Sequence, residues 1–407
     1  MLTTPLAPQL SDELVAPYPK AAPHAEVLPP LYVYLAQVPD PRDPRGVRHP
    51  LGAVLALVCC ALLCGSRHLT AVAEWGRNHS DELRSALGFT RPMTPAGSTL
   101  HNLLQDLDWT ALEGQIRKWV TAVEAHLGAV APEASEEALA VDGKSMRGAL
   151  KLNAAVTATV TALGHRLGLT AGAAEVPGGD EIGAVEALLQ NLVLAGKVVT
   201  LDALHTQRKT ARIIGEQGGQ YVMTVKGNQP ELQEAVVGLF RPERASEQDR
   251  ESVWETDQGH GRVENRWLLA ISVPEGAAEA LGTWPGVAQA FVVERRVWKK
   301  KQRVGQRELV YGITSLTREQ AGPADLLRLV RGHWKVETRS HYIRDVTFGE
   351  DASLVRTGKL PQVLALLRAT AISRFRADGV VNIAKETRRL AAQATDCLRL
   401  LGIASDN

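Results

Sequence analysis

The sequence predicts an α/β protein in which a mixed sheet with flanking helices follows an all-helical N-terminal domain and is interrupted by a β-rich insertion. Three observations predict this architecture. Residues 31–128 carry apolar side chains at helical spacing. Residues 138–248 alternate short β-branched runs with helical stretches. Residues 249–317 contain strand-like runs separated by turn-forming residues, and residues 318–407 return to helix.

The composition is that of a globular protein with more than one domain, because the chain has 407 residues, of which 45% are hydrophobic and 22% charged. Residues 1–30 hold seven prolines and no basic segment ahead of an apolar one, so we expect a flexible leader and no signal peptide. The apolar run 51–65 is too short to cross a membrane and predicts a buried helix. We therefore expect a cytoplasmic protein without a membrane partner.

Four cysteines occur in the chain, and three of them lie in the apolar run at Cys59, Cys60 and Cys64. No neighbouring histidines have the spacing of a zinc finger. We therefore predict buried free thiols in a reducing compartment.

The helical N-terminal domain is predicted from five amphipathic or apolar stretches, at 51–64, 68–78, 80–87, 94–104 and 109–127. A short helix, a turn and a capped second helix within 68–105 would suit a helix-turn-helix that binds DNA. Most such helix pairs only pack against each other, so both interpretations stay open.

The mixed sheet is predicted from strand-like runs that alternate with helical ones. The expected strands are 138–141, 198–201 and 221–225, a hairpin formed by 154–163 and 167–175, and the insertion strands 252–256, 262–271, 288–298 and 308–315. Helices are expected at 182–195, 208–216, 324–345, 360–377 and 383–400.

Three carboxylates are the candidate catalytic and metal-binding residues. Asp142 and Asp202 each end a short β-branched run, and Glu337 lies in a helical stretch. Cleavage of a phosphodiester needs an activated oxygen nucleophile and a stabilised leaving oxygen, which two metal ions ~3.5–4 Å apart can provide. Three unrelated surface carboxylates are the alternative.

The motifs around these carboxylates resemble one family. Its strings stand in order along residues 32–377: Val-Asp-Gly-Lys-Ser-Met-Arg-Gly, Asp-Glu-Ile, Thr-Leu-Asp-Ala-Leu-His-Thr-Gln, Tyr-Val-Met-Thr-Val-Lys-Gly-Asn-Gln, Gly-His-Gly-Arg-Val-Glu-Asn-Arg, Arg-Gly-His-Trp-Lys-Val-Glu and Asp-Val-Thr-Phe-Gly-Glu-Asp-Ala-Ser. Together they resemble the H-repeat-associated branch of bacterial insertion-sequence DDE transposases. The sequence departs from the family pattern at Gly178, Asp180, Thr338 and Tyr342, and no departure removes a carboxylate.

The resemblance implies a ribonuclease-H-like catalytic domain, with Asp142 on the first strand, Asp202 on the fourth and Glu337 on a helix beyond the insertion. It implies that Asp142 bridges two Mg²⁺ ions, for which Mn²⁺ would substitute, while Asp202 and Glu337 each hold one of them. The implied reaction cuts the element ends in double-stranded DNA and joins the freed 3′-hydroxyl to target DNA, with a homodimer on paired ends. A nuclease of the same fold that does not join strands, and an inactive DNA-binding remnant, are the alternatives.

Several residues near these carboxylates are candidates for DNA contact. Residues 294–308 carry seven positive and two negative charges around a predicted hairpin tip, which could follow DNA phosphates with an aromatic ring at an unpaired end. The candidates are Lys144, Arg147, Lys226, Asn228, Trp298, Lys299, Lys300, Lys301, His341 and Arg344. Balancing charges and a solvated hairpin are the alternatives.

Two other ligand sets are possible from the sequence. His333, Glu337 and His341 are spaced by four residues, so an α-helix would present them on one face and could bind zinc. Glu350 and Asp351 are alternative acidic ligands in an expected loop.

The charge distribution agrees with a polyanionic partner. Residues 291–407 hold 22 basic and 12 acidic residues, whereas residues 131–290 hold 14 and 21. A basic third beside an acidic middle favours DNA near a cation site, and hence association with the bacterial nucleoid.

Overall fold

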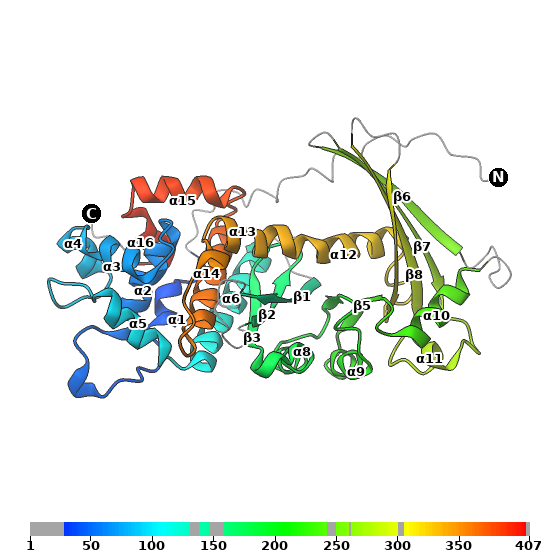
Figure 1. Ribbon diagram of the computed structural model, residues 1–407, viewed down its shortest axis with the longest axis horizontal. Helices are drawn as coiled ribbons and strands as arrows, with labels where there is room; N and C mark the ends of the chain where they lie inside the picture. Colours follow the sequence, from blue (N-terminus) through cyan, green and yellow to red (C-terminus); the bar gives the residue numbers. More distant parts are fainter. Residues whose placement is uncertain are drawn as a thin grey trace. The chain divides into compact units, whose positions relative to one another are not determined.

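The computed structural model describes residues 28–130, 138–146, 158–241, 250–259, 262–299 and 305–403 (Figure 1). These residues belong to two compact units. The sheet unit comprises Val193–Trp334 in its described part, and the core unit comprises the described parts of Tyr18–Leu192 and Lys335–Asn407.

The core unit begins with helices whose apolar residues pack together. They are α1 (Leu31–Leu35), α2 (Leu51–Leu63), α3 (Leu69–Arg77), α4 (Asp81–Ala86), α5 (Gly97–Gln105) and α6 (Trp109–Val130). Nearly every residue of α2 is buried, which explains its unbroken apolar sequence. Ser80 caps α4 by accepting a hydrogen bond from the N–H of Leu83.

The C-terminal helices share the core of these N-terminal helices. They are α14 (Leu360–Ala377), α15 (Ile383–Ala392) and α16 (Asp396–Leu401), and their buried residues join one hydrophobic cluster with those of α1 to α6. Residues that the sequence assigns to the first and last domains thus fold around one core. Cys59, Cys60 and Cys397 are buried, and all four cysteines are free, as predicted. Within the described residues, no helix combines the length and apolar character needed to span a bilayer.

Strands β1 (Ala138–Ser145), β2 (Ala158–Gly164) and β3 (Thr170–Glu175) form an antiparallel sheet in the core unit. The predicted hairpin is present as β2 and β3. Gly172 faces Leu188 and Leu192, while the next residue, Ala173, receives a contact from Glu113 of α6. Because neighbouring residues of a strand point to opposite faces, α8 (Glu181–Gln190) covers one face of this sheet and α6 covers the other.

The sheet unit has strand order β4-β5-β9-β8-β7-β6. Its strands are β4 (Val198–Leu201), β5 (Gln220–Val225), β6 (Arg250–Gly259), β7 (Arg262–Ser272), β8 (Gln289–Lys299) and β9 (Gln306–Thr314). β4 and β5 are parallel, joined through α9 (Arg208–Glu216), and β5 pairs antiparallel with β9. The four strands predicted for the insertion are therefore a continuation of the β4-β5 sheet, as Figure 1 shows for β6 to β8. Helices α10 (Pro230–Leu239) and α11 (Glu279–Gly282) complete this unit.

The helix predicted over 324–345 consists of three segments. An α-helix, α12 (Pro323–Val336), is followed by a π-helical turn, Glu337–His341, and by a short helix, α13 (Tyr342–Val346). A 3-10 turn, Glu350–Ala352, follows Gly349, whose φ of 65° is in the left-handed region that favours glycine. The π-helical turn begins at the predicted catalytic glutamate.

Candidate metal centre

Asp142, Glu337 and His341 come together in the core unit. Each offers one ligand atom, and the three atoms all lie within 4.8 Å of one another. The Nδ1 atom of His341 is 3.8 Å from Oδ2 of Asp142 and 3.5 Å from Oε2 of Glu337. The side chain of His341 is buried, that of Asp142 is 21% exposed and that of Glu337 is 71% exposed, so the cluster opens to solvent on the glutamate side.

The local sequence explains how each ligand is placed. Ala138–Val141 are buried, and β1 leaves the core at Asp142. The π-helical turn places Glu337 and His341 on the turn that meets this strand end. Single π-helical turns inside α-helices occur frequently at functional sites.

The zinc alternative required His333 on the same face as Glu337 and His341. His333 is not part of the cluster found among the described residues. Its ring is buried, and its Nδ1 lies 3.2 Å from Oγ1 of Thr200 in the sheet unit. A π-helical turn has more residues per turn than an α-helix, so the spacing by four no longer defines one face.

Lys144, expected to bind DNA, is instead an internal ion-pair partner. It lies two residues after Asp142 on β1, only 8% exposed, and donates to Oδ2 of Asp345 on α13 at 2.8 Å. Because residues two apart on a strand share a face, this pair lies on the same side of β1 as Asp142. It connects β1 to the helical segment that carries Glu337 and His341.

Arg344, also expected to contact DNA, is fully buried. Its guanidinium pairs with both carboxylate oxygens of Glu350, at 2.7 and 3.0 Å, and Arg368 lies 3.5 Å from the same carboxylate. Phosphate therefore has no access to Arg344 in this structure. Burial acts to raise the pKa of Glu350, but the two arginines outweigh it and hold that pKa below its usual value. Glu350 consequently serves this internal network, which corrects its expectation as an alternative metal ligand.

Asp202 directly follows β4 in the sheet unit, at the predicted end of the fourth strand. Its Oδ1 accepts hydrogen bonds from the N–H groups of Leu204 and His205, at 3.0 and 3.2 Å. This side-chain turn fixes the carboxylate, which remains 43% exposed. One carboxylate oxygen thus stabilises the loop, and the group stays open to solvent.

The remaining candidates for DNA contact have several environments. Lys226 and Asn228 are exposed, and the Asn228 amide donates to the carbonyl of Ala203 at 2.6 Å. His341 is buried within the cluster, and Trp298 is half-buried on β8. Arg147, Lys300, Lys301 and the side chain of Lys299 lie outside the described residues.

The arginines of the predicted basic hairpin are paired with acids. Arg295 contacts Glu264, and both Arg296 and Arg307 contact Glu294. This pairing offsets much of the positive charge on the described part of β8 and β9. The proximity of His341 to Asp142 escaped the sequence interpretation, although its spacing of four residues from Glu337 was a signal.

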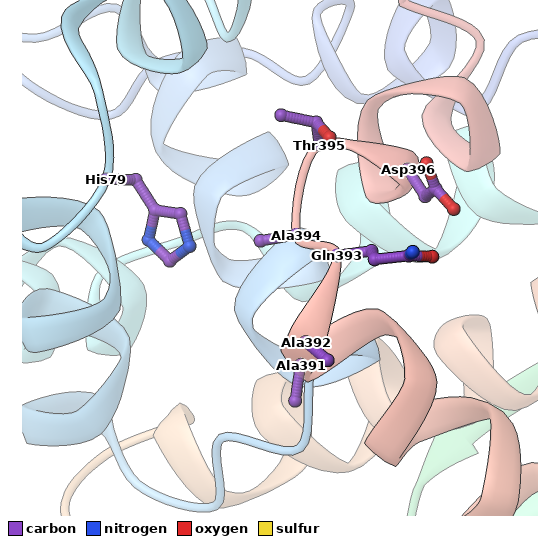
Figure 2. Close-up of a pocket in the computed structure, with 7 residues that line it drawn as sticks. All are labelled: His79, Ala391, Ala392, Gln393, Ala394, Thr395 and Asp396. Carbon is purple, nitrogen blue, oxygen red and sulfur yellow. The ribbon is translucent and has the colours of Figure 1, made fainter.

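A pocket lies elsewhere in the core unit, with a volume of about 560 Å³. Its lining is His79 and the segment 391–396 between α15 and α16 (Figure 2). It includes none of the three cluster residues, so the strongest candidate for chemistry remains the carboxylate cluster.

Comparison with known proteins identifies the family. Residues 106–374 match the model of the transposase DDE domain, and residues 32–120 match the model of the region associated with that domain. The chain belongs to the DDE transposase family. Its relatives place it in the H-repeat-associated branch. It is 26% identical over 349 residues to "Putative transposase YncI" of Escherichia coli O157:H7, covering 84% of this chain and 86% of that protein.

Two further relatives agree in extent. The "H repeat-associated putative transposase YhhI" of Escherichia coli K12 is 25% identical over 350 residues, covering 84% of this chain and 89% of its own length. An uncharacterised protein in the dhlA 3′ region of Xanthobacter autotrophicus is 29% identical over 276 residues, covering 67% and 90%. Membership of this transposase implies DNA as the partner.

Proposed function

We propose that this transposase cuts the ends of its element and joins the freed 3′-hydroxyl to target DNA, with Asp142, Asp202 and Glu337 as the metal-binding carboxylates. The observation that carries the proposal is the meeting of Asp142 and Glu337, which lie 195 residues apart in the sequence, with His341 between their oxygens.

The donor set fits a hard divalent cation. Two carboxylates supply oxygen ligands, which Mg²⁺ and Mn²⁺ prefer, and the exposed Glu337 leaves that side open for water or a phosphate oxygen. The imidazole of His341 is a donor that Mn²⁺ accepts more readily than Mg²⁺. Divalent cations bound here would supply activation of the attacking oxygen and stabilisation of the leaving oxygen.

The side chains have distinct tasks in this proposal. Asp142, at the strand end, is the carboxylate shared between cation positions, and Glu337 holds the outer one. Buried His341 keeps the two carboxylates apart at fixed distances. Asp202, fixed by its own turn, provides the third carboxylate. Lys226 and the tip of the β8-β9 hairpin are proposed to contact DNA phosphates.

The decisive experiment compares Asp142→Asn with the wild-type chain on labelled element-end DNA with Mg²⁺. The variant keeps the shape of the side chain and loses its charge, so we expect cleavage at background level and end binding close to wild type. Asp325→Asn is the control, because Asp325 is an exposed carboxylate on α12 outside the cluster. Wild-type cleavage by Asp142→Asn would refute the assignment.

Adding unlabelled target DNA to the same reaction tests strand transfer. We expect a joined product that depends on all three carboxylates. Cleavage without joined product would identify a nuclease of the same fold, and binding without cleavage would identify an inactive remnant.

A further inference from the structure

Glu181 lies against the backbone of β1 beside Asp142. It is the first residue of α8, which packs on β1, and it is half-buried. A Cβ atom built on Gly143 would lie 2.8 Å from Oε2 of Glu181 and closer still to the other carboxylate atoms. The carboxylate of Glu181 therefore occupies the space that any side chain at position 143 would fill.

Gly143 is thus required for a close approach and not for an unusual backbone conformation. It is paired within β1, opposite Val160 of β2, and is not among the glycines with positive φ. The sequence Asp142-Gly143 puts a ligand carboxylate next to the one position on the strand where α8 can bring a second carboxylate up to the main chain.

Both carboxylates border the same peptide group. Oδ1 of Asp142 accepts the N–H of Gly143 at 2.9 Å, while the Glu181 carboxylate covers the Cα of Gly143. Lys144, the nearest lysine along the strand, is already paired with Asp345. The negative charge of Glu181 is therefore directed to the surroundings of Asp142.

We propose that Glu181 is a fourth acidic residue of the metal centre, a role that rests on the proposed function. It would bind the cation held by Asp142, directly or through that cation's water molecules, which Mg²⁺ releases reluctantly. Charge supports this role, since three carboxylates carry −3 and two divalent cations carry +4. Glu181 brings the protein's contribution to −4.

The test measures binding of Mn²⁺ alone, by electron paramagnetic resonance of the free ion, without DNA. Glu181→Gln removes the charge and keeps the shape. Gly143→Ala leaves Glu181 intact but displaces its carboxylate, and the displaced group is the end of a flexible side chain, so the fold should tolerate it. We expect each variant to lower Mn²⁺ affinity by about 10- to 100-fold.

The combination of both sites gives the sharpest result. In a Glu181→Ala background, Gly143→Ala no longer displaces a carboxylate, so it should cause no further loss of Mn²⁺ affinity. Glu231→Gln is the matched charge control, because Glu231 is an exposed first-turn glutamate of α10. Gly114→Ala controls for the added methyl group, because nothing lies within 4 Å of that position.

The outcomes separate this inference from the proposed function. Wild-type Mn²⁺ affinity in Glu181→Gln, or an undiminished effect of Gly143→Ala without Glu181, would overturn the role of Glu181 alone. Failure of the wild-type chain to bind Mn²⁺, or wild-type binding by Asp142→Asn, would overturn both.

Discussion

His333 is buried on α12, with its Nδ1 beside the hydroxyl oxygen of Thr200. Burial lowers the pKa of His333 to about 4, and the nearby charge of Asp202 only partly opposes this effect. The imidazole is therefore neutral at pH 7, and protonation would charge a ring that water does not reach.

This burial predicts a loss of stability in acid. The folded-state pKa is below the unfolded value of ~6.5, so the stabilisation is complete above pH 6.5 and is lost as pH falls towards 4, by at most ~3 kcal/mol. Urea unfolding at pH 7.5 and pH 5 should show a smaller pH effect for His333→Gln, which cannot titrate, than for wild type. His101→Gln, on α5, is the control. Equal slopes for both variants and wild type would refute the prediction.

Gly312 gives a second prediction at the residue scale. A Cβ atom at this position of β9 would overlap the ring of Phe291 and lie 2.7 Å from the carbonyl oxygen of Met223. Since backbone and a buried ring cannot yield easily, Gly312→Ala should lower the free energy of unfolding by about 1–3 kcal/mol. Gly238→Ala, in α10 with nothing within 4 Å, should instead be neutral or stabilising by ~0.5–1 kcal/mol. Thermal unfolding of both variants measures the difference.

At the scale of elements, the pair formed by Lys144 and Asp345 joins β1 to α13. It sits close to Asp142 on one side and to His341 on the other. Because Lys144 is buried, loss of its partner leaves a charge in a poorly hydrated position. The pair therefore holds the two elements that carry the metal ligands in register.

A charge reversal tests this positioning role. Lys144→Met and Asp345→Asn should each cost about 1.5–3 kcal/mol of stability and weaken Mn²⁺ binding. The double variant Lys144→Asp with Asp345→Lys should recover part of both losses, and Lys144→Arg should recover most. Lys359→Met breaks the exposed pair with Glu175 and should have little effect, ~0–1 kcal/mol. If Lys144 acted only on DNA, the reversal would rescue nothing.

The elements also show what the sequence could predict. Local periodicity was enough for the β2-β3 hairpin and for β4 and β5, because the alternation of side chains is set within each strand. The pairing of β5 with β9 joins residues about ninety positions apart, such as Val222 and Thr314, and no local pattern reports it. The π-helical turn was equally hidden, since the apolar spacing over 324–345 continues without a break.

The candidate site follows the same division. Strand ends and a helix predicted Asp142, Asp202 and Glu337 as candidates. The burial of Arg344 and Lys144 could not be predicted, because each is compensated by a carboxylate, Glu350 or Asp345, whose direction depends on tertiary packing.

At the scale of the whole molecule, much of the basic excess of residues 291–407 is compensated. Besides the β8-β9 arginines, Arg331 pairs with Glu255 and Asp257, and Arg389 pairs with Glu386 and Asp396. A paired guanidinium contributes less to long-range attraction of DNA than a free one. Overall charge is therefore a weaker argument for DNA than the arrangement of the carboxylates.

The number of carboxylate centres leads to the last prediction. Each chain has one Asp142, and the proposed reaction acts on two element ends, each of which needs carboxylates at its own phosphodiester. Two chains should therefore assemble on two ends. Asp142→Asn, which should bind ends without cutting them, allows the complex to be trapped in Mg²⁺. Native mass spectrometry of this variant with end DNA should show two chains and two duplexes, and DNA with a scrambled terminal sequence should not form this complex. A single chain bound to both ends would contradict the prediction, because one set of carboxylates would then have to serve two cleavage sites in turn.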